Sequence, residues 1–144
     1  VIKNFLKNLD TKIKKNNPII VILQPTSPLR TSTQIRNAVK IFEEKKLKSL
    51  MSVSKNKITP YKDMIIKNGK LSPIFGKNNL IKNRQSFPQT YKPNGAIFIF
   101  EELSTTSLNN DSFYNNSHPF IMDDISSIDI DNLNDYKLAK KHFK

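Results

Sequence analysis

The chain has 144 residues, a net charge of +12 and no cysteine. This length suits one domain of ordinary size. The absence of cysteine excludes disulfide scaffolds, thiolate metal sites and cysteine nucleophiles. No apolar run approaches the roughly 20 residues that span a bilayer, and the first residues lack the pattern of a signal peptide. We therefore expect a cytoplasmic protein without a membrane partner.

The positive charge does not by itself indicate a nucleic-acid partner. Lysine supplies 21 of the 24 basic residues and is spread over every segment. A base-stacking platform would instead interleave arginines with aromatic residues. Five of the twelve acidic residues lie close together near the C-terminal end: Asp123, Asp124, Asp129, Asp131 and Asp135. This cluster in a basic chain favours a bound cation or a nearby helix N-terminus.

The predicted elements alternate between helices and strands. Apolar residues at helical spacing predict a first helix that ends at an Asn-Asn-Pro sequence. The apolar run Pro18–Leu23 is typical of a strand buried on both faces of a parallel sheet. After a proline-containing loop, Thr31 and Gln34 form a capping-box pattern for a helix that reaches about Lys46. Residues 48–54 predict a second strand, an order that favours a right-handed crossover in an α/β sheet.

The pattern changes to short extended pieces between residues 55 and 89, where Asn68–Gly69 is a hairpin-turn signal. This segment is too short to form its own core. We expect it to be a dimerisation insertion whose apolar side chains pack against a second subunit: Ile65, Ile66, Ile74 and Phe75. Gly95–Phe100 predicts another core strand, residues 121–130 hold a short extended piece, and a final helix starts at Asp131.

Two aspartates, a glutamine and an arginine are candidates for a binding site on residue chemistry alone. In an extended backbone the Asp129 and Asp131 carboxylates would lie on the same side, where two hard oxygen donors suit Mg²⁺. Alternatively, Asp131 is the N-cap of the final helix and Asp129 a solvated acid. Gln24 follows a core strand, where ligands of α/β sheets bind, although it can also bond its own backbone. Arg84 offers a planar fork for a carboxylate or phosphate, or a surface ion pair.

Three motifs resemble those of the acylneuraminate cytidylyltransferases, which are the CMP-sialic acid synthetases. They are QPTSPLR at residues 24–30, RQSFPQTYKPNGAIFIF at residues 84–100 and SIDIDNLNDYKLAKK at residues 127–141, and they follow the family's order. The resemblance implies a Rossmann-like nucleotidyltransferase sheet, usually in a homodimer. It also implies transfer of CMP from CTP to N-acetylneuraminate or a related nonulosonic acid, with Mg²⁺ as cofactor and pyrophosphate as product.

The resemblance also implies roles for individual residues. Asp129 and Asp131 would hold Mg²⁺, Asp131 would in addition orient or deprotonate the attacking hydroxyl, and Arg84 would belong to the catalytic site. Phe98 stands where the family often has tyrosine, so the phenol hydrogen bond is missing. The resemblance assigns the sugar-acid pocket to Gln24, Lys62, Arg84, Asn94 and Phe98, with Phe113 and Tyr114 as an aromatic pair offered to the neighbouring subunit.

The family's first strand and its glycine- and lysine-containing phosphate loop have no counterpart in this sequence. The chain, which begins with Val1, is therefore expected to be a partial cytidylyltransferase domain over residues 1–144. It would be incomplete at the N-terminus, lack most contacts to CTP and be inactive alone. Three alternatives stay open: a synthetase for another acidic sugar, a non-catalytic homologue that acts as a binding or dimerisation module, and a basic nucleic-acid-binding module.

Overall fold

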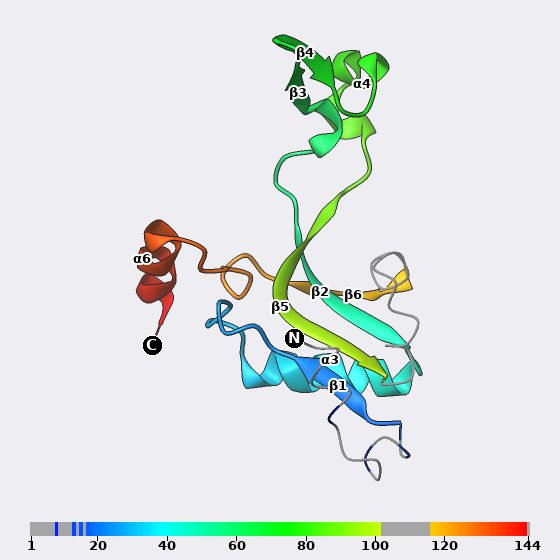
Figure 1. Ribbon diagram of the computed structural model, residues 1–144, viewed down its shortest axis with the longest axis vertical. Coiled ribbons are helices and arrows are strands. Elements are labelled where there is room, and N and C mark those ends of the chain that lie inside the picture. The colour runs from blue at the N-terminus through cyan, green and yellow to red at the C-terminus, as the bar shows by residue number, and fades with distance from the viewer. Residues whose placement is uncertain (1–7, 9–12, 14, 16, 102–115, 144) are drawn as a thin grey trace. The chain divides into compact units, whose positions relative to one another are not determined.

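The computed structural model describes residues 8, 13, 15, 17–101 and 116–143. The chain divides into two compact units, Val1–Ser54 with Pro93–Lys144, and Lys55–Lys92. In chain order the elements are β1 (Ile19–Ile22), α3 (Ser32–Glu44), β2 (Ser49–Lys55), the 3-10 helix η1 (Pro60–Lys62), β3 (Met64–Lys67), β4 (Lys70–Pro73), α4 (Lys77–Ile81), the 3-10 helix η2 (Arg84–Ser86), β5 (Tyr91–Glu101), β6 (His118–Met122) and α6 (Leu133–His142) (Figure 1).

The first unit contains a four-stranded mixed sheet in the order β1-β5-β2-β6. β1 pairs with β5 in antiparallel fashion, and β2 pairs with β6 in parallel fashion. The N–H of Glu101, at the end of β5, donates to the carbonyl of Lys48, just before β2. These two neighbouring strands therefore also run in opposite directions. It follows that β1, β2 and β6 point the same way, and that their carboxyl ends share one edge of the sheet with Asn94 and Gly95 of β5.

The position of β1 differs from the sequence prediction. Its apolar run predicts a strand buried on both faces of a parallel sheet, but β1 is the terminal strand in the sheet order and its neighbour β5 is antiparallel. Ile19 and Val21 are 38% and 36% exposed. The expectation is wrong because an apolar run favours strand formation without specifying which strands lie beside it.

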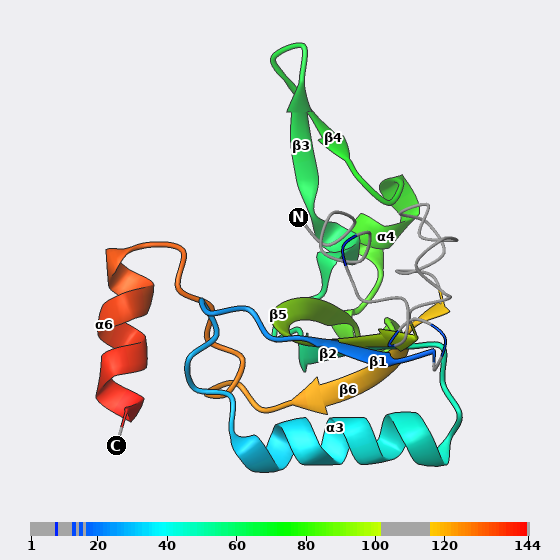
Figure 2. The same cartoon turned by 60° about the horizontal axis from the view of Figure 1, so that its bottom comes forward.

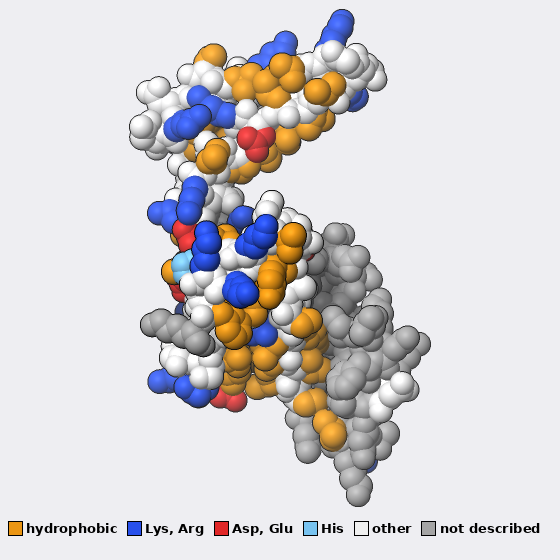
Figure 3. All heavy atoms as spheres, turned by 90° about the vertical axis from the view of Figure 1, so that its left-hand side faces the viewer, with side chains coloured by type: hydrophobic (Ala, Val, Ile, Leu, Met, Phe, Trp, Pro, Cys, Tyr) orange, Lys and Arg blue, Asp and Glu red, His pale blue; other side chains and the backbone are white. Residues whose placement is uncertain are grey.

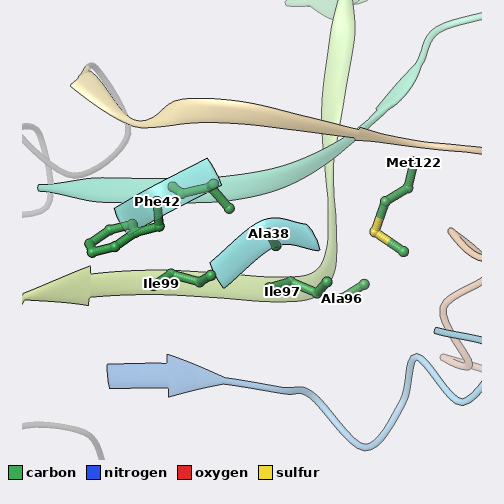
Figure 4. Packing of buried hydrophobic residues seen from close by; sticks show 7 residues of the cluster. Ala38, Phe42, Ala96, Ile97, Ile99 and Met122 are labelled. Carbon is green, nitrogen blue, oxygen red and sulfur yellow. The ribbon is translucent and has the colours of Figure 1, made fainter. Parts of the chain in front are cut away.

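Helix α3 lies along one face of this sheet (Figure 2). Its buried residues Ala38 and Phe42 pack with Leu50 of β2 and with Ile97 and Ile99 of β5. The close view of the core shows Ala38 and Phe42 together with Ile97 and Ile99 (Figure 4). Burial of a side chain as large as leucine, isoleucine or phenylalanine contributes about 1.5–3 kcal/mol. The main hydrophobic core therefore lies between α3 and the two central strands.

The start of α3 agrees with the sequence prediction. The N–H of Gln34 donates to Thr31 Oγ1 at 3.2 Å, and the N–H of Thr31 donates to Gln34 Oε1 at 2.9 Å. This reciprocal pair is the capping box that the sequence pattern predicts. The helix ends at Glu44, with Lys45 as its C-cap, close to the predicted end.

The second unit contains the two-stranded antiparallel sheet of β3 and β4. Asn68 and Gly69 join the two strands with φ values of 53° and 71°, and two positive φ values are typical of a tight hairpin turn. No residue of this unit is fully buried. The ring of Tyr61 stacks on Phe87 with centroids 5.1 Å apart and meets Phe75 at 5.3 Å. The unit thus packs through aromatic contacts without a buried core.

The final helix begins later than the sequence pattern predicts. Its N-cap is Asn132, whose Oδ1 accepts from the N–H groups of Asn134 and Asp135 at 2.9 and 3.2 Å. Asp135 in turn accepts from the N–H of Asn132. The interpretation of Asp131 as the N-cap is therefore wrong, because the neighbouring asparagine, an equally good cap, takes that position.

Most of the predicted N-terminal helix lies outside the described residues, as do residues 102–115. In the part of the chain that the structure describes, no helix is long and apolar enough to cross a membrane.

Candidate functional site

The end of β1, the beginning of β5 and the loop before α6 meet at one edge of the sheet. Gln24 follows β1, and Gly95 near the start of β5 has a φ of 74°. A Cβ atom on Gly95 would overlap Oε1 of Gln24 and would lie 3.5 Å from Oδ2 of Asp129. Gln24 and Asp129, two of the predicted site residues, therefore place oxygen atoms around the same point beside the glycine.

The loop that carries Asp129 lies beside the QPTSPLR loop. Ser27 Oγ donates to Asp129 Oδ1 at 3.5 Å, and the N–H of Ile130 donates to the carbonyl of Thr26 at 2.8 Å. Residues 128–130 are not part of a strand. These contacts, and not a strand, set the position of Asp129.

Asp131 is exposed and lies just before the N-cap of α6. Its backbone N–H donates to the Asp135 carboxylate at 3.2 Å. Because Asn132 serves as the N-cap, the Asp131 carboxylate is not used to cap the helix. The two predicted metal ligands thus differ in environment, with Asp129 half-buried against Ser27 and Asp131 facing solvent.

Asn94 is a buried link within the site and is 5% exposed. Its Oδ1 accepts from Ser52 Oγ at 2.6 Å and from the N–H of Ala96 at 3.2 Å. Its Nδ2 donates to Ser127 Oγ at 2.8 Å. Since Ser127 lies two residues before Asp129, the Asn94 amide ties the loop that carries this carboxylate to β2 and β5. The structure therefore gives Asn94 a supporting position, and its contact with a sugar stays a prediction.

Arg30 is a site residue that the sequence analysis missed. Its Nη1 donates to the carbonyls of Gln24 at 2.9 Å and Ala96 at 2.8 Å. Burial lowers the pKa of its guanidinium group from its ordinary value, and an arginine at neutral pH stays charged. Two signals for it were present in the sequence: it ends the QPTSPLR motif, and the chain has three arginines.

Asp123, the first residue after β6, anchors a turn at the same edge. Its carboxylate accepts from Ser126 Oγ at 2.5 Å, from the N–H groups of Ile125 and Ser126 at 3.0 and 2.9 Å, and from Gln34 Nε2 at 3.2 Å. The hydrogen bonds from Ser126 and Ile125, above all the one from the Ser126 hydroxyl, lower the pKa of Asp123. The cap of α3 is thereby joined to the turn that leads to Asp129.

The second unit contains two further predicted site residues. Arg84 and Lys57 line a pocket of about 330 Å³ together with polar residues such as Gln85 and Thr59, and no acidic residue lines it. This lining suits an anionic group. Lys62 is not among the residues that line this pocket. Its Nζ donates to the carbonyl of Leu80 at 3.0 Å.

The aromatic candidates are only partly described. Phe98 is half-buried and lies opposite Ile22 in the β1–β5 ladder. Phe113 and Tyr114 fall outside the described residues. Among the residues that the structure describes, no group of three or more histidine, aspartate or glutamate side chains could hold a metal ion.

The fold and this edge site define a class of protein. A mixed α/β sheet with polar residues beyond the carboxyl ends of its strands is compatible with a Rossmann-like fold, in which ligands bind at that edge. No protein-family model matches the chain.

Three curated relatives narrow this class. The chain is 38% identical over 125 residues to an N-acylneuraminate cytidylyltransferase of Escherichia coli, a match that covers 82% of the chain and 28% of that protein. It is 35% identical over 127 residues to a CMP-N,N'-diacetyllegionaminic acid synthase of Legionella pneumophila, covering 85% of the chain and 52% of the relative. A post-translational flagellin modification protein B of Campylobacter coli is 29% identical over 142 residues, covering 97% of the chain and 59% of the relative.

Over the part of the chain that they match, these relatives support a CMP-sialic acid synthetase-like family. This confirms the resemblance drawn from the three sequence motifs. The chain spans 28% to 59% of the length of these relatives.

Proposed function

We propose that the chain carries the part of a cytidylyltransferase that binds the acidic sugar and the metal ion. The whole reaction joins CMP from CTP to N-acetylneuraminate or a related nonulosonic acid and releases pyrophosphate. The observation that carries this proposal is the approach of Gln24 and Asp129 oxygen atoms beside Gly95, at the edge where ligands of α/β sheets bind. Cytidylyltransferase and CMP-diacetyllegionaminic acid synthase are the names of two relatives. We expect the reaction to take place in the cytoplasm.

Positioning and electrostatics provide most of the rate in phosphoryl transfer. The anomeric hydroxyl oxygen of the sugar acid forms a bond to the α-phosphorus of CTP as the bond to pyrophosphate breaks, and the hydroxyl proton is lost. The amide of Gln24 can both donate to and accept from a polyhydroxylated sugar. The exposed Asp131 carboxylate would accept a hydrogen bond from the attacking hydroxyl and orient or deprotonate it.

The oxygen donors at this edge fit Mg²⁺. Asp129 and Asp131 would hold the ion, because Mg²⁺ prefers hard oxygen ligands and is commonly bound by one or two carboxylates, with water and substrate phosphate completing its shell. A site with two acidic residues therefore needs no third protein carboxylate. When bound, the ion would neutralise charge on the phosphates of CTP.

We propose that the pocket of the second unit receives an anionic group. The guanidinium of Arg84 can bind a carboxylate through two parallel hydrogen bonds, which a lysine cannot reproduce, and Lys57 adds a second positive charge. Lys62 and Asn94 are hydrogen bonded to other parts of the protein. The part of Asn94 would be to support the sugar pocket of the first unit, and that of Phe98 to pack beside it, whereas Lys62 would support the second unit.

A homodimer is part of this proposal, and the second unit supports it. Ile66 is 77% exposed and Ile65, Ile74 and Phe75 are each about half exposed, and hydrophobic side chains are visible over the surface of this unit (Figure 3). The same observation favours a second candidate function, that of a non-catalytic dimerisation module. The cytidylyltransferase proposal predicts that an acidic sugar binds, whereas a dimerisation module need not bind one.

Titration with N-acetylneuraminate, followed by NMR, tests the proposal. We expect the side-chain amide resonance of Gln24 to shift on titration, and Gln24→Met to raise the dissociation constant about tenfold, because the pocket then loses an amide that bonds the sugar. Asn37→Met, which removes an exposed amide from α3, is the matched control and should bind normally. Equal binding by the original chain and Gln24→Met would contradict the proposal.

We also expect the 144 residues by themselves not to turn over CTP, because the contacts that the family makes with this nucleotide were not found in the sequence. Pyrophosphate release is the measurement, with CTP, Mg²⁺ and N-acetylneuraminate supplied together. Release above a protein-free control would show this expectation to be wrong while leaving the assignment of the sugar site intact.

A further inference from the structure

The ladder between β1 and β5 stops short of the site. Pairing joins Ile19–Ile22 to Phe98–Glu101. Continuing this register by two residues would place Gln24 opposite Ala96. β5 extends through Ala96 as a strand, whereas β1 ends at Ile22. Gln24 and Ala96 therefore lie beyond the last residue pair of the β1–β5 ladder.

Arg30 joins the two backbones at this position. Its Nη1 donates to the carbonyl of Gln24 at 2.9 Å and to the carbonyl of Ala96 at 2.8 Å. In an antiparallel ladder, paired residues exchange hydrogen bonds between backbone N–H and carbonyl groups. Here one charged nitrogen serves both carbonyls, and hydrogen bonds from a charged donor are roughly twice as strong as neutral ones. The Arg30 side chain therefore sets the separation between the two backbones where the ladder ends.

This separation controls where the Gln24 side chain lies. Gly95 is the residue next to Ala96, and the space beside its Cα is filled by Oε1 of Gln24, with Asp129 Oδ2 close to the same point. Gln24 lies just after β1 and Gly95 lies in β5, next to the two backbone positions that Arg30 joins. A change in the spacing of these strands therefore moves the Gln24 amide relative to both Gly95 and the Asp129 carboxylate.

We propose that Arg30 is a positioning residue that holds the end of β1 against β5 and thereby places the Gln24 amide for binding the acidic sugar. Both of its hydrogen-bond partners are backbone carbonyls, so it acts on the positions of the two backbones. The effect on sugar affinity rests on the proposed function, whereas the effect on Gln24 rests on the geometry alone.

The test compares two substitutions of Arg30 with a matched control. Arg30→Met removes both hydrogen bonds. Arg30→Lys keeps the positive charge and three N–H donors, but without the planar shape of the guanidinium. Arg36→Met is the control, because Arg36 is exposed and its Nη2 donates to Thr33 on the same helix. The probes are the NMR resonances of the Gln24 side-chain amide and the Gly95 N–H, and a titration with N-acetylneuraminate.

We expect Arg30→Met to shift both resonances in the absence of ligand and to raise the dissociation constant about tenfold. Arg30→Lys should give a smaller effect of the same kind, and Arg36→Met should match the original chain. Unchanged resonances in Arg30→Met, or normal sugar affinity despite a displaced Gln24, would overturn the proposal.

The same experiment distinguishes two further outcomes. If the resonances shift as expected but the original chain does not bind N-acetylneuraminate, the proposed function fails and the structural role of Arg30 is supported. If Arg30→Met does not fold, Arg30→Lys decides, since changes confined to residues around Gln24 and Gly95 support the proposal. Changes spread over the whole sheet would overturn it.

Discussion

Gly95 combines a positive φ of 74° with a side-chain oxygen of Gln24 in the space that a Cβ would fill. Either condition alone favours glycine, because other residues avoid positive φ and any Cβ would displace the amide. Gly69 has a similar φ of 71° but has nothing within 4 Å of its Cβ position. Substituting Gly69 therefore tests the cost of the backbone conformation alone, whereas substituting Gly95 adds the cost of a clash with the Gln24 side chain.

Gly95→Ala is expected to destabilise the first unit by more than Gly69→Ala destabilises the second. Gly69→Ala should cost about 1–2 kcal/mol, the price of a left-handed conformation, whereas Gly95→Ala adds the displacement of Gln24. Denaturant titration, followed through NMR resonances of each unit, measures both losses. Equal losses, together with unchanged sugar affinity in Gly95→Ala, would show that the crowding at Gln24 has no consequence.

The two aspartates allow a direct test of metal binding. Asp129→Asn and Asp131→Asn keep the side-chain shape and remove a negative charge, so affinity for a hard divalent cation should fall while the fold is kept. Line broadening by added Mn²⁺ should be strongest around residues 129–131 in the original chain and should weaken at least tenfold in either variant. Asp63→Asn in the second unit is the control. Broadening that survives both substitutions would restore the view of these residues as loop acids.

At the scale of elements, Gln34 joins α3 to the turn after β6. Its Oε1 accepts from the N–H of Thr31, and its Nε2 donates to Asp123 Oδ2 and, at 2.8 Å, to Ser126 Oγ. The same side chain thus completes a helix cap and binds a turn from a distant part of the chain. Through this turn and Ser127, the helix start, the sheet edge and Asp129 form one connected structure.

The stability of this junction should depend on pH through Asp123. The pKa of Asp123 is lowered in the folded state, chiefly by the Ser126 hydroxyl, from an ordinary value of 3.8. Its ionised form therefore stabilises the fold at pH values above 3.8, and this contribution is lost as the pH falls through the lower folded-state pKa. Asp123→Asn should cost about 1 kcal/mol at pH 7, and the difference from the original chain should be smaller at a pH below the ordinary value of 3.8.

Urea denaturation at the two pH values checks this expectation. Ser126→Ala supplies the matched variant, because it removes the main hydrogen-bond donor of the carboxylate. The variant that carries both Asp123→Asn and Ser126→Ala should lose less unfolding free energy than the sum of the losses in the two single variants. The reason is that both substitutions remove the same interaction. A constant difference between Asp123→Asn and the original chain at both pH values would contradict the assignment.

For the whole molecule, the contrast between its two units is informative. The first unit buries a cluster of seven hydrophobic residues between α3 and the sheet, whereas the second unit buries none. Apolar side chains that are half or more exposed on a small two-stranded hairpin favour association, because such a hairpin is marginally stable alone. A second copy of the chain is the partner that we expect, in a symmetric contact.

Ile66→Lys is expected to weaken this association. Ile66 is 77% exposed on β3, so a lysine there does not disturb an internal contact but would place a charge in the interface. Sedimentation at micromolar concentration should show a dimer for the original chain and mostly monomer for the variant. Ile121→Lys, which changes a 58% exposed isoleucine of β6, is the control and should stay dimeric. A monomeric original chain would contradict the prediction.

Local structure could be predicted where the deciding contacts lie close in sequence. The strands β1, β2 and β5, the capping box of Thr31 and Gln34 and the turn at Asn68–Gly69 all follow from residues next to one another or three positions apart. The family could also be recognised, because three short motifs occur in the right order. The N-cap of α6 was missed by one residue, since Asp and Asn are equally good caps and stand side by side in this sequence.

The tertiary structure decided what depends on residues far apart. Arg30 reaches Ala96 across 66 positions, Ser27 reaches Asp129 across 102, and Asn94 reaches Ser52 across 42. No local pattern could show that β1 lies beside an antiparallel strand, that Asn94 is buried, or that Arg30 joins two backbones. The physical reason is that a residue's preference for helix, strand or turn depends on its nearest neighbours in sequence. Its hydrogen-bond partners depend instead on which strands and loops the folded sheet brings to the same edge.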